Sequence, residues 1–176
     1  MKVRQISSAV ELDELTREIE EAADRTRSTL ASIGAGSDGI NLLWSMKFQT
    51  VGHDPLDPGR HLNLIEQLNQ TFTYLTTIRA VRVLFDLHPE YAPFTLNLGT
   101  APGSDIQSTR NGGLAAEVFA ATSPKSNRKL DADIVKVGGI SAQLKYVFFM
   151  SPGFEAGRQQ KLERKGVRVW SVGVGL

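Results

Sequence analysis

The sequence predicts an α/β protein in which helices flank a mixed β-sheet. Residues 8–33 and 61–87 repeat apolar side chains at helical spacing, which predicts two long helices in the first half of the chain. After residue 93, short strand-like segments come first in succession and then alternate with helix-like segments. We therefore expect a meander of three strands, followed by two strands that are joined through helices and lie parallel to the last meander strand.

Composition limits the class of protein. The chain has 176 residues, of which 41% are hydrophobic and 22% are charged, and this suits a globular domain with a substantial core. No run approaches the ~18 apolar residues of a membrane span, and the N-terminus lacks the apolar segment of a signal peptide. There is no cysteine. We expect a cytoplasmic protein without membrane association, disulfides or thiolate chemistry.

Charge is distributed unevenly along the chain. Residues 1–60 hold seven Lys and Arg against ten Asp and Glu, whereas residues 121–176 hold ten Lys and Arg against four Asp and Glu. A basic C-terminal third is compatible with a phosphate-rich partner such as DNA, and equally with a solvated helix surface.

The first helix is expected over residues 8–33. Ser8 and Glu11 form a capping box, and Gly34 is a stop signal. Because the other faces of this helix are charged, it should pack on the domain edge or pair with a second copy of itself. We expect residues 1–60 to form a helical arm that packs on or dimerises the domain.

The segments between the two long helices carry weaker signals. Residues 34–39 predict a loop, since no strand precedes them and the Walker-type ending is missing. Residues 40–51 fit either a helix or a strand, and residues 52–59 predict a turn-rich break. The helix over 61–87 carries a polar stripe that faces either solvent or a wet functional groove. That stripe consists of Glu66, Gln70, Thr73 and Thr77.

Residues 61–176 are expected to form the α/β core. A hairpin turn at 110–113 should join the second and third strands. Helices are expected from Ser123-Pro124 to about residue 137 and, with a basic surface, over 154–165. The expected strands are 94–98, 104–109, 114–122, 145–150 and 167–172.

A lone carboxylate lies in the third of these strands. Glu117 is the single polar residue between Leu114 and Ala121, and an unpaired polar group in an apolar sheet costs roughly 2–7 kcal/mol. The hairpin would bring Asp105 beside it, and two close carboxylates repel unless a cation neutralises them. Mg²⁺ (or Mn²⁺) shared by Asp105 and Glu117 would do so. The alternatives are a core arginine partner or an exposed sheet face.

The order of elements and these two acidic residues resemble the PD-(D/E)XK, or restriction-endonuclease-like, superfamily over residues 61–172. The resemblance implies that Asp105, in "GSDIQS", and Glu117, in "EVF", bind Mg²⁺ and support cleavage of phosphodiester bonds. It also implies a restriction-endonuclease-like fold, with Glu66 as a further acidic residue contributed by the long helix.

The sequence departs from this family at the motif lysine, where it has Phe119. Lys125 or Lys129, at the start of the following helix, could reach back toward Glu117, or Gln107 could hold a water molecule instead. Without such a replacement, the fold would bind nucleic acid or a protein partner without cleaving.

We therefore expect a metal-dependent endonuclease that hydrolyses DNA phosphodiester bonds, of the restriction, defence or DNA-processing type. The alternatives are a catalytically degenerate nuclease-fold module that only binds, and an unrelated α/β protein in which Glu117 is structural. Cutting both strands implies a homodimer, and a partner subunit is possible; the sequence does not distinguish DNA from RNA. The expected nucleic-acid contacts are Lys125, Arg128, Lys129, Arg158 and Lys161.

Overall fold

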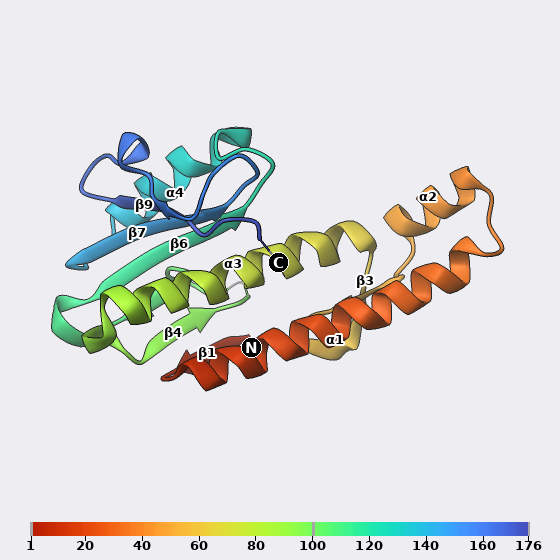
Figure 1. Ribbon diagram of the computed structural model, residues 1–176, viewed down its shortest axis with the longest axis horizontal. Coiled ribbons are helices and arrows are strands. Elements are labelled where there is room, and N and C mark those ends of the chain that lie inside the picture. The colour runs from red at the N-terminus through yellow and green to blue at the C-terminus, as the bar shows by residue number, and fades with distance from the viewer. Residues whose placement is uncertain (1, 100, 176) are drawn as a thin grey trace. The chain divides into compact units, whose positions relative to one another are not determined.

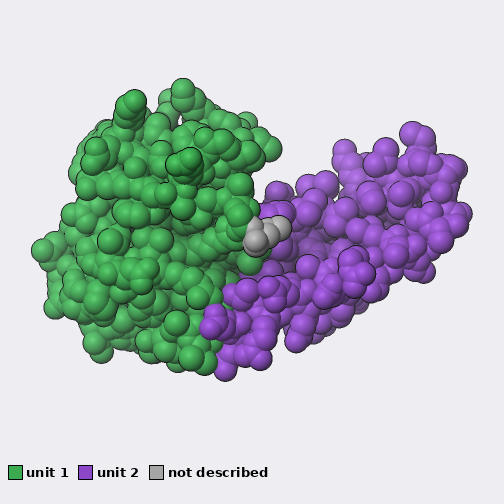
Figure 2. Space-filling view, viewed as in Figure 1, with its two compact units in different colours: residues 1–12, 73–176 green, residues 13–72 purple. Residues whose placement is uncertain are grey.

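The computed structural model describes residues 2–99 and 101–175. The chain forms two compact units, one of residues 1–12 and 73–176 and the other of residues 13–72 (Figure 2). The sequence analysis had divided the chain at residue 60. The first unit takes in the N-terminus because strand β1 (Val3–Ile6) pairs with β4 (Phe94–Asn97).

The first unit is built on a seven-stranded mixed sheet, as the predicted α/β class requires (Figure 1). The strand order is β1-β4-β5-β6-β7-β9-β8. β6, β7 and β9 are parallel neighbours, and the other pairs are antiparallel, which confirms the predicted meander and the predicted parallel strands. The remaining strands are β5 (Ile106–Ser108), β6 (Leu114–Ala120), β7 (Leu144–Met150), β8 (Gly157–Arg158) and β9 (Arg168–Ser171).

Helix α4 (Lys129–Gly138) covers one face of the central strands (Figure 1). Its side chains Leu130, Ile134 and Val137 are buried against alternate residues of the strands. Successive side chains of a strand point to opposite faces, so the odd-numbered residues of β6 lie under α4. The strand residues in this cluster are Ala115, Phe119, Val147, Phe149 and Val169, and Val167, just before β9, joins them.

Helix α3 (Leu64–Leu87) contacts the opposite face of the sheet through its second half. Phe85 packs edge-on against Phe94 with ring centroids 5.3 Å apart, and the Tyr74 hydroxyl donates to the carbonyl of Leu98 at 2.7 Å. Central strands buried on both faces explain the almost continuously apolar run of β7.

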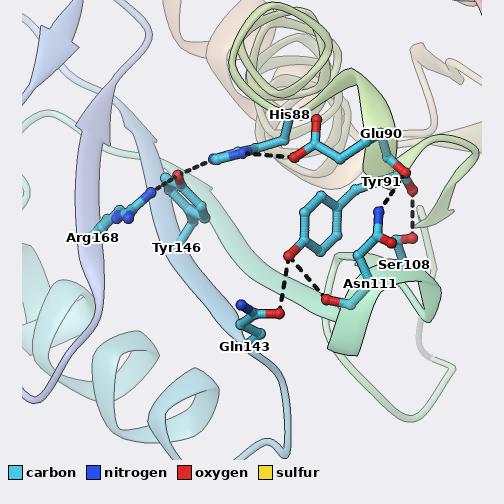
Figure 3. A network of polar contacts seen from close by, with 8 residues as sticks. All are labelled: His88, Glu90, Tyr91, Ser108, Asn111, Gln143, Tyr146 and Arg168. Atoms are coloured by element: carbon cyan, nitrogen blue, oxygen red, sulfur yellow. Dashed lines mark hydrogen bonds and ion pairs between the residues drawn. The ribbon is translucent and has the colours of Figure 1, made fainter.

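A network of polar contacts lies on this second face of the sheet, just after the end of α3 (Figure 3). Tyr146 lies between His88 and Arg168. Its hydroxyl oxygen is 2.7 Å from Nε2 of His88 and accepts a hydrogen bond from the Arg168 guanidinium at 2.7 Å. Tyr91 donates to the carbonyl of Asn111 at 3.0 Å. These contacts satisfy the buried tyrosine hydroxyls, so we assign the network to stability.

The second unit contains most of α1 (Ala9–Gly34), α2 (Gly39–Phe48), a hairpin of β2 (Gly52–Asp54) and β3 (Asp57–Leu62), and the start of α3. Gln67 ties its elements together. Its side-chain carbonyl accepts from the Thr26 hydroxyl at 2.6 Å and from the His53 amide at 2.8 Å. The stretch 40–51, which fits either a helix or a strand in sequence, is helical up to Phe48, and the expected break at 52–59 contains β2 and the start of β3.

Helix α1 confirms the first predicted helix, and its apolar stripe is buried within the chain. Leu12, Leu15 and Ile19 are each at most 3% exposed within the chain. Of the two roles expected for this helix, packing within the chain accounts for the apolar stripe, and pairing with a second copy stays a prediction.

Two further expectations about the C-terminal half need correction. Residues 154–165 do not form a helix; they contain β8 and the short 3₁₀ turn Gln160–Leu162. Gly157 has φ +139°, outside the helical region, and Arg158 pairs with Trp170 of β9. The helix expected from Ser123 begins only at Lys129, because Asn127 and Arg128 adopt positive φ angles.

Among the described residues, no helix has the length and apolar character needed to span a membrane.

Candidate active site

Glu117 lies in β6, and Asp105 lies just before the neighbouring strand β5. β5 and β6 are antiparallel with Ile106 opposite Ala116, so Asp105 and Glu117 are the next residues beyond this pair. Asp105 immediately precedes β5, and its Oδ2 accepts a hydrogen bond from the backbone N–H of Val118 at 2.7 Å. The hairpin thus holds one carboxylate against the strand that carries the other.

The direct partner of Glu117 is Lys136 of α4. Lys136 Nζ donates to Glu117 Oε2 at 2.7 Å, with the glutamate side chain 2% exposed and the lysine 52% exposed. From the sequence, Lys125 or Lys129 was the predicted partner. Lys129 instead donates to Asp133 Oδ1 at 2.6 Å, and Lys125 lies exposed before the helix.

Lys129, Asp133 and Lys136 form a charged stripe on α4. They are spaced i, i+4 and i+7, so they share one side of the helix. Asp133 is only 2% exposed, and its charge interacts with those of Asp105 and Glu117. Sequence reasoning missed Asp133 and Lys136, although this spacing beside the apolar stripe of the same helix was a usable signal.

Burial dominates the electrostatics of the cluster. It raises the pKa of Glu117 to about 7, opposed by the Lys136 hydrogen bond and reinforced by the nearby charge of Asp105. Burial also raises the pKa of Asp105 and of Asp133. Burial works against the charge of Lys136, but the hydrogen bond to Glu117 and the surrounding carboxylates raise its pKa. Three acids and two lysines therefore share this site, and the acids hold protons more tightly than usual.

Two carboxylate oxygens in this cluster are buried without a hydrogen-bond partner among the described residues. They are Glu117 Oε1 and Asp133 Oδ2. Leaving such an atom unpaired costs about 1–3 kcal/mol or more, and a cation near Glu117 Oε1 would remove that cost.

The residues near Glu117 would suit a magnesium site with only two protein ligands. No group of three or more His, Asp or Glu side chains within residues 2–99 and 101–175 is arranged to hold a metal ion. Mg²⁺ commonly binds through one or two carboxylates and completes its shell with water and substrate phosphate. Asp105 and Glu117 would supply the two carboxylates of such a site.

A pocket of about 340 Å³ lies at the start of β6, and neither Asp105 nor Glu117 lines it. Its wall includes Gly103 and Ser104, which precede Asp105, and Gln107, which follows it. Ala115 contributes from the α4 face of β6. The lining carries no charged side chain and no residue of the charged cluster.

Phe119, at the motif lysine position, belongs to the core. It is 3% exposed and stacks on Phe149 with ring centroids 5.8 Å apart. Packing therefore requires an apolar side chain at this position, because it points under α4.

The other predicted site residues lie outside this cluster. Glu66 is exposed in the first turn of α3, within the second unit. Arg128 is exposed just before α4, and Lys161 is exposed in the 3₁₀ turn after β8. Arg158 binds both carboxylate oxygens of Glu163, at 2.8 and 2.9 Å. Its guanidinium is thus already paired.

No protein-family model, curated protein or solved structure matched the chain.

Proposed function

We propose that the chain is a metal-dependent endonuclease of the PD-(D/E)XK type, in which Lys136 takes the place of the motif lysine. The observation that carries this proposal is the 2.7 Å contact between Lys136 and a buried Glu117 whose second oxygen has no described partner. A buried acid, a neighbouring acid and a lysine on one sheet face are the side chains that this chemistry uses.

Asp105 and Glu117 would hold Mg²⁺ or Mn²⁺ in this proposal. The bound ion would polarise a phosphoryl oxygen and lower the pKa of a bound water. The hydrogen bond from Val118 to Asp105 fixes one carboxylate, and the ion pair with Lys136 fixes the other. The chain's own contribution is therefore to present two acids in fixed positions.

Lys136 would stabilise the charge that develops on the phosphate. Its ammonium carries three donors, of which Glu117 takes one, and half of its side chain is exposed. A fixed cation near developing negative charge lowers the barrier, because little reorganisation is needed during the reaction. Lys129 would pair with Asp133 and add positive charge near the site.

Lys125, Arg128 and Lys161 are proposed to contact the DNA backbone. Each is exposed in the first unit, which also carries the acidic pair. Phosphate contacts of this kind position nucleic acid without reading its sequence.

A second candidate is a module of the same kind that binds nucleic acid without cleaving it. Two observations favour it: Lys136 already neutralises Glu117, and Phe119 is locked in the core. In this alternative the ion pair replaces the metal, and the buried acid serves only to hold α4 on the sheet.

Cleavage of supercoiled plasmid and of genomic DNA, modified and unmodified, separates the two candidates. The endonuclease proposal predicts nicking or cutting with Mg²⁺ or Mn²⁺ that stops in EDTA and is lost in Glu117→Ala. Clean wild-type protein that binds DNA and leaves every substrate intact would favour the binding module.

A further inference from the structure

Helix α2 of the second unit turns its apolar side toward solvent. Ile40 is 77% exposed, Leu43 63%, Trp44 52% and Phe48 62%, while the residue that the helix buries is Ser45. An ordinary surface helix does the opposite and packs its apolar side on the core. We call these four exposed side chains the α2 apolar face.

The α2 apolar face is a continuous surface on an anchored helix. Its residues are spaced i, i+3, i+4 and i+8, and the rings of Trp44 and Phe48 lie 6.0 Å apart. Asp38 caps the helix by accepting from the amide of Asn41 at 2.9 Å. The second unit exposes three more large apolar side chains on α3, Ile65 at 51%, Leu68 at 43% and Phe72 at 38%.

The area involved is on the scale of a protein interface. With about 150–250 Å² for a fully accessible aromatic side chain, the α2 apolar face leaves roughly 500 Å² open to water. Large exposed patches on monomers are usually functional. A standard dimer buries about 800 Å² on each partner, so this face would supply the apolar core of such an interface and its polar surroundings the rim.

The chemistry of the face favours a second copy of the chain over an anionic partner. Helix α2 carries one charged residue, Lys47, whose ammonium lies 5.2 Å from the Phe48 ring centroid. A lipid surface or nucleic acid would require several basic residues around the face. Two identical neutral apolar faces are complementary to each other, as a two-fold interface requires.

We propose that the chain self-associates as a two-fold dimer through the α2 apolar face. This inference is independent of the proposed endonuclease activity, since every residue that it uses lies in the second unit.

Sedimentation velocity across about 1–100 µM protein tests the proposal, because mass action makes the dimer fraction rise with protein concentration. The wild type is expected to form dimers. Leu43→Glu and Ile40→Glu should each weaken association at least about tenfold, because a charge enters the apolar centre of the interface. Val10→Glu is the matched control, as Val10 is also exposed, at 64%, but lies in the first unit.

Trp44 provides a second readout. In a Trp170→Phe background, Trp44 is the remaining tryptophan, and its emission should shift to shorter wavelength as protein concentration rises. A wild type that stays monomeric throughout, or a dimer that is unaffected by both α2 substitutions, would overturn the proposal. Dissociation by Val10→Glu alone would also overturn it, because the interface would then lie elsewhere.

Discussion

At the scale of single residues, Glu117 is under two opposing influences. Removal from water favours its neutral form, whereas Lys136 at 2.7 Å favours its carboxylate form. Burial outweighs the lysine, and the pKa rises to about 7. Near neutral pH, the side chain can therefore be switched between forms by a modest change in its surroundings, such as a bound cation.

The raised pKa of Glu117 predicts a pH-dependent stability. The folded state binds this proton more tightly than the unfolded chain, whose glutamate titrates near 4.5. The stabilising contribution is therefore complete below pH 4.5 and is lost as the pH rises through about 7. Relative to Glu117→Gln, the wild type should lose on the order of 1–3 kcal/mol across this window.

Urea unfolding of both proteins in EDTA, at several pH values across the window, measures this difference. A wild-type curve that runs parallel to that of Glu117→Gln at every pH would contradict the account.

A second residue-scale prediction concerns Phe119. Phe119→Lys would give the sequence the lysine of the PD-(D/E)XK motif that it resembles, but it places an ammonium under α4, where the phenyl ring is 3% exposed. We expect a loss of at least about 3 kcal/mol in unfolding free energy and no gain in cleavage. Phe119→Leu, which keeps the site apolar, should cost less, about 1–2 kcal/mol. Equal stability of Phe119→Lys and wild type in thermal unfolding would refute the core assignment.

At the scale of elements, α4 links the apolar core to the charged cluster. One side of the helix buries Leu130, Ile134 and Val137, and the adjacent side carries Lys129, Asp133 and Lys136. The apolar contacts fix the position of the helix, and that position sets the reach of Lys136 to Glu117.

Two substitutions at neighbouring positions of α4, Ile134→Ala and Val135→Ala, test whether the buried side of the helix holds it on the sheet. Ile134 is fully buried, so its truncation should lower the unfolding free energy by about 2–5 kcal/mol. Val135→Ala is the matched control, since Val135 is 59% exposed and should change stability by less than about 0.5 kcal/mol. Urea denaturation provides both values, and similar losses in the two variants would contradict the described packing of α4.

Elements with a strong periodic pattern were predictable from sequence, and those that depend on distant pairing were not. The helices α1 and α3 and the strands β4, β6, β7 and β9 follow their apolar spacing. β1 and β8 are short edge segments that become strands only through their partners β4 and β9. Local propensity carries no information about such pairing.

The candidate site was predictable in part for the same reason. Asp105 and Glu117 share a hairpin, so a local argument brings them together. Lys136 follows Glu117 by 19 residues and reaches it only because α4 crosses back over the sheet. Its contact depends on the helix axis and rotation, which the packing of Leu130, Ile134 and Val137 on the sheet fixes.

At the scale of the whole molecule, the two units carry different functional features. The first unit carries the acidic pair and the basic C-terminal segments, and the second carries the α2 apolar face. Residues 121–176 hold six more basic than acidic side chains. In our proposals, the first unit acts on nucleic acid and the second joins two copies.

Nucleic-acid binding by the first unit predicts a defined salt dependence. Each phosphate contact releases condensed counterions, so replacing Lys125 and Arg128 with Met should reduce the slope of log affinity against log salt by about 2. Arg17→Met, on the exposed surface of α1 in the second unit, should leave the slope unchanged. Fluorescence anisotropy with a labelled duplex measures the slopes, and an unchanged slope in the double variant would contradict these contacts.

The most direct test of the central claim is single-turnover cleavage of DNA with Mg²⁺ by wild type, Lys136→Met and Lys125→Met, with binding measured in parallel. If Lys136 replaces the motif lysine, Lys136→Met should still bind DNA but cleave it at least about 100-fold more slowly. Lys125→Met should keep most of its cleavage rate. Wild-type-like cleavage by Lys136→Met, or an inactive wild type, would contradict the claim.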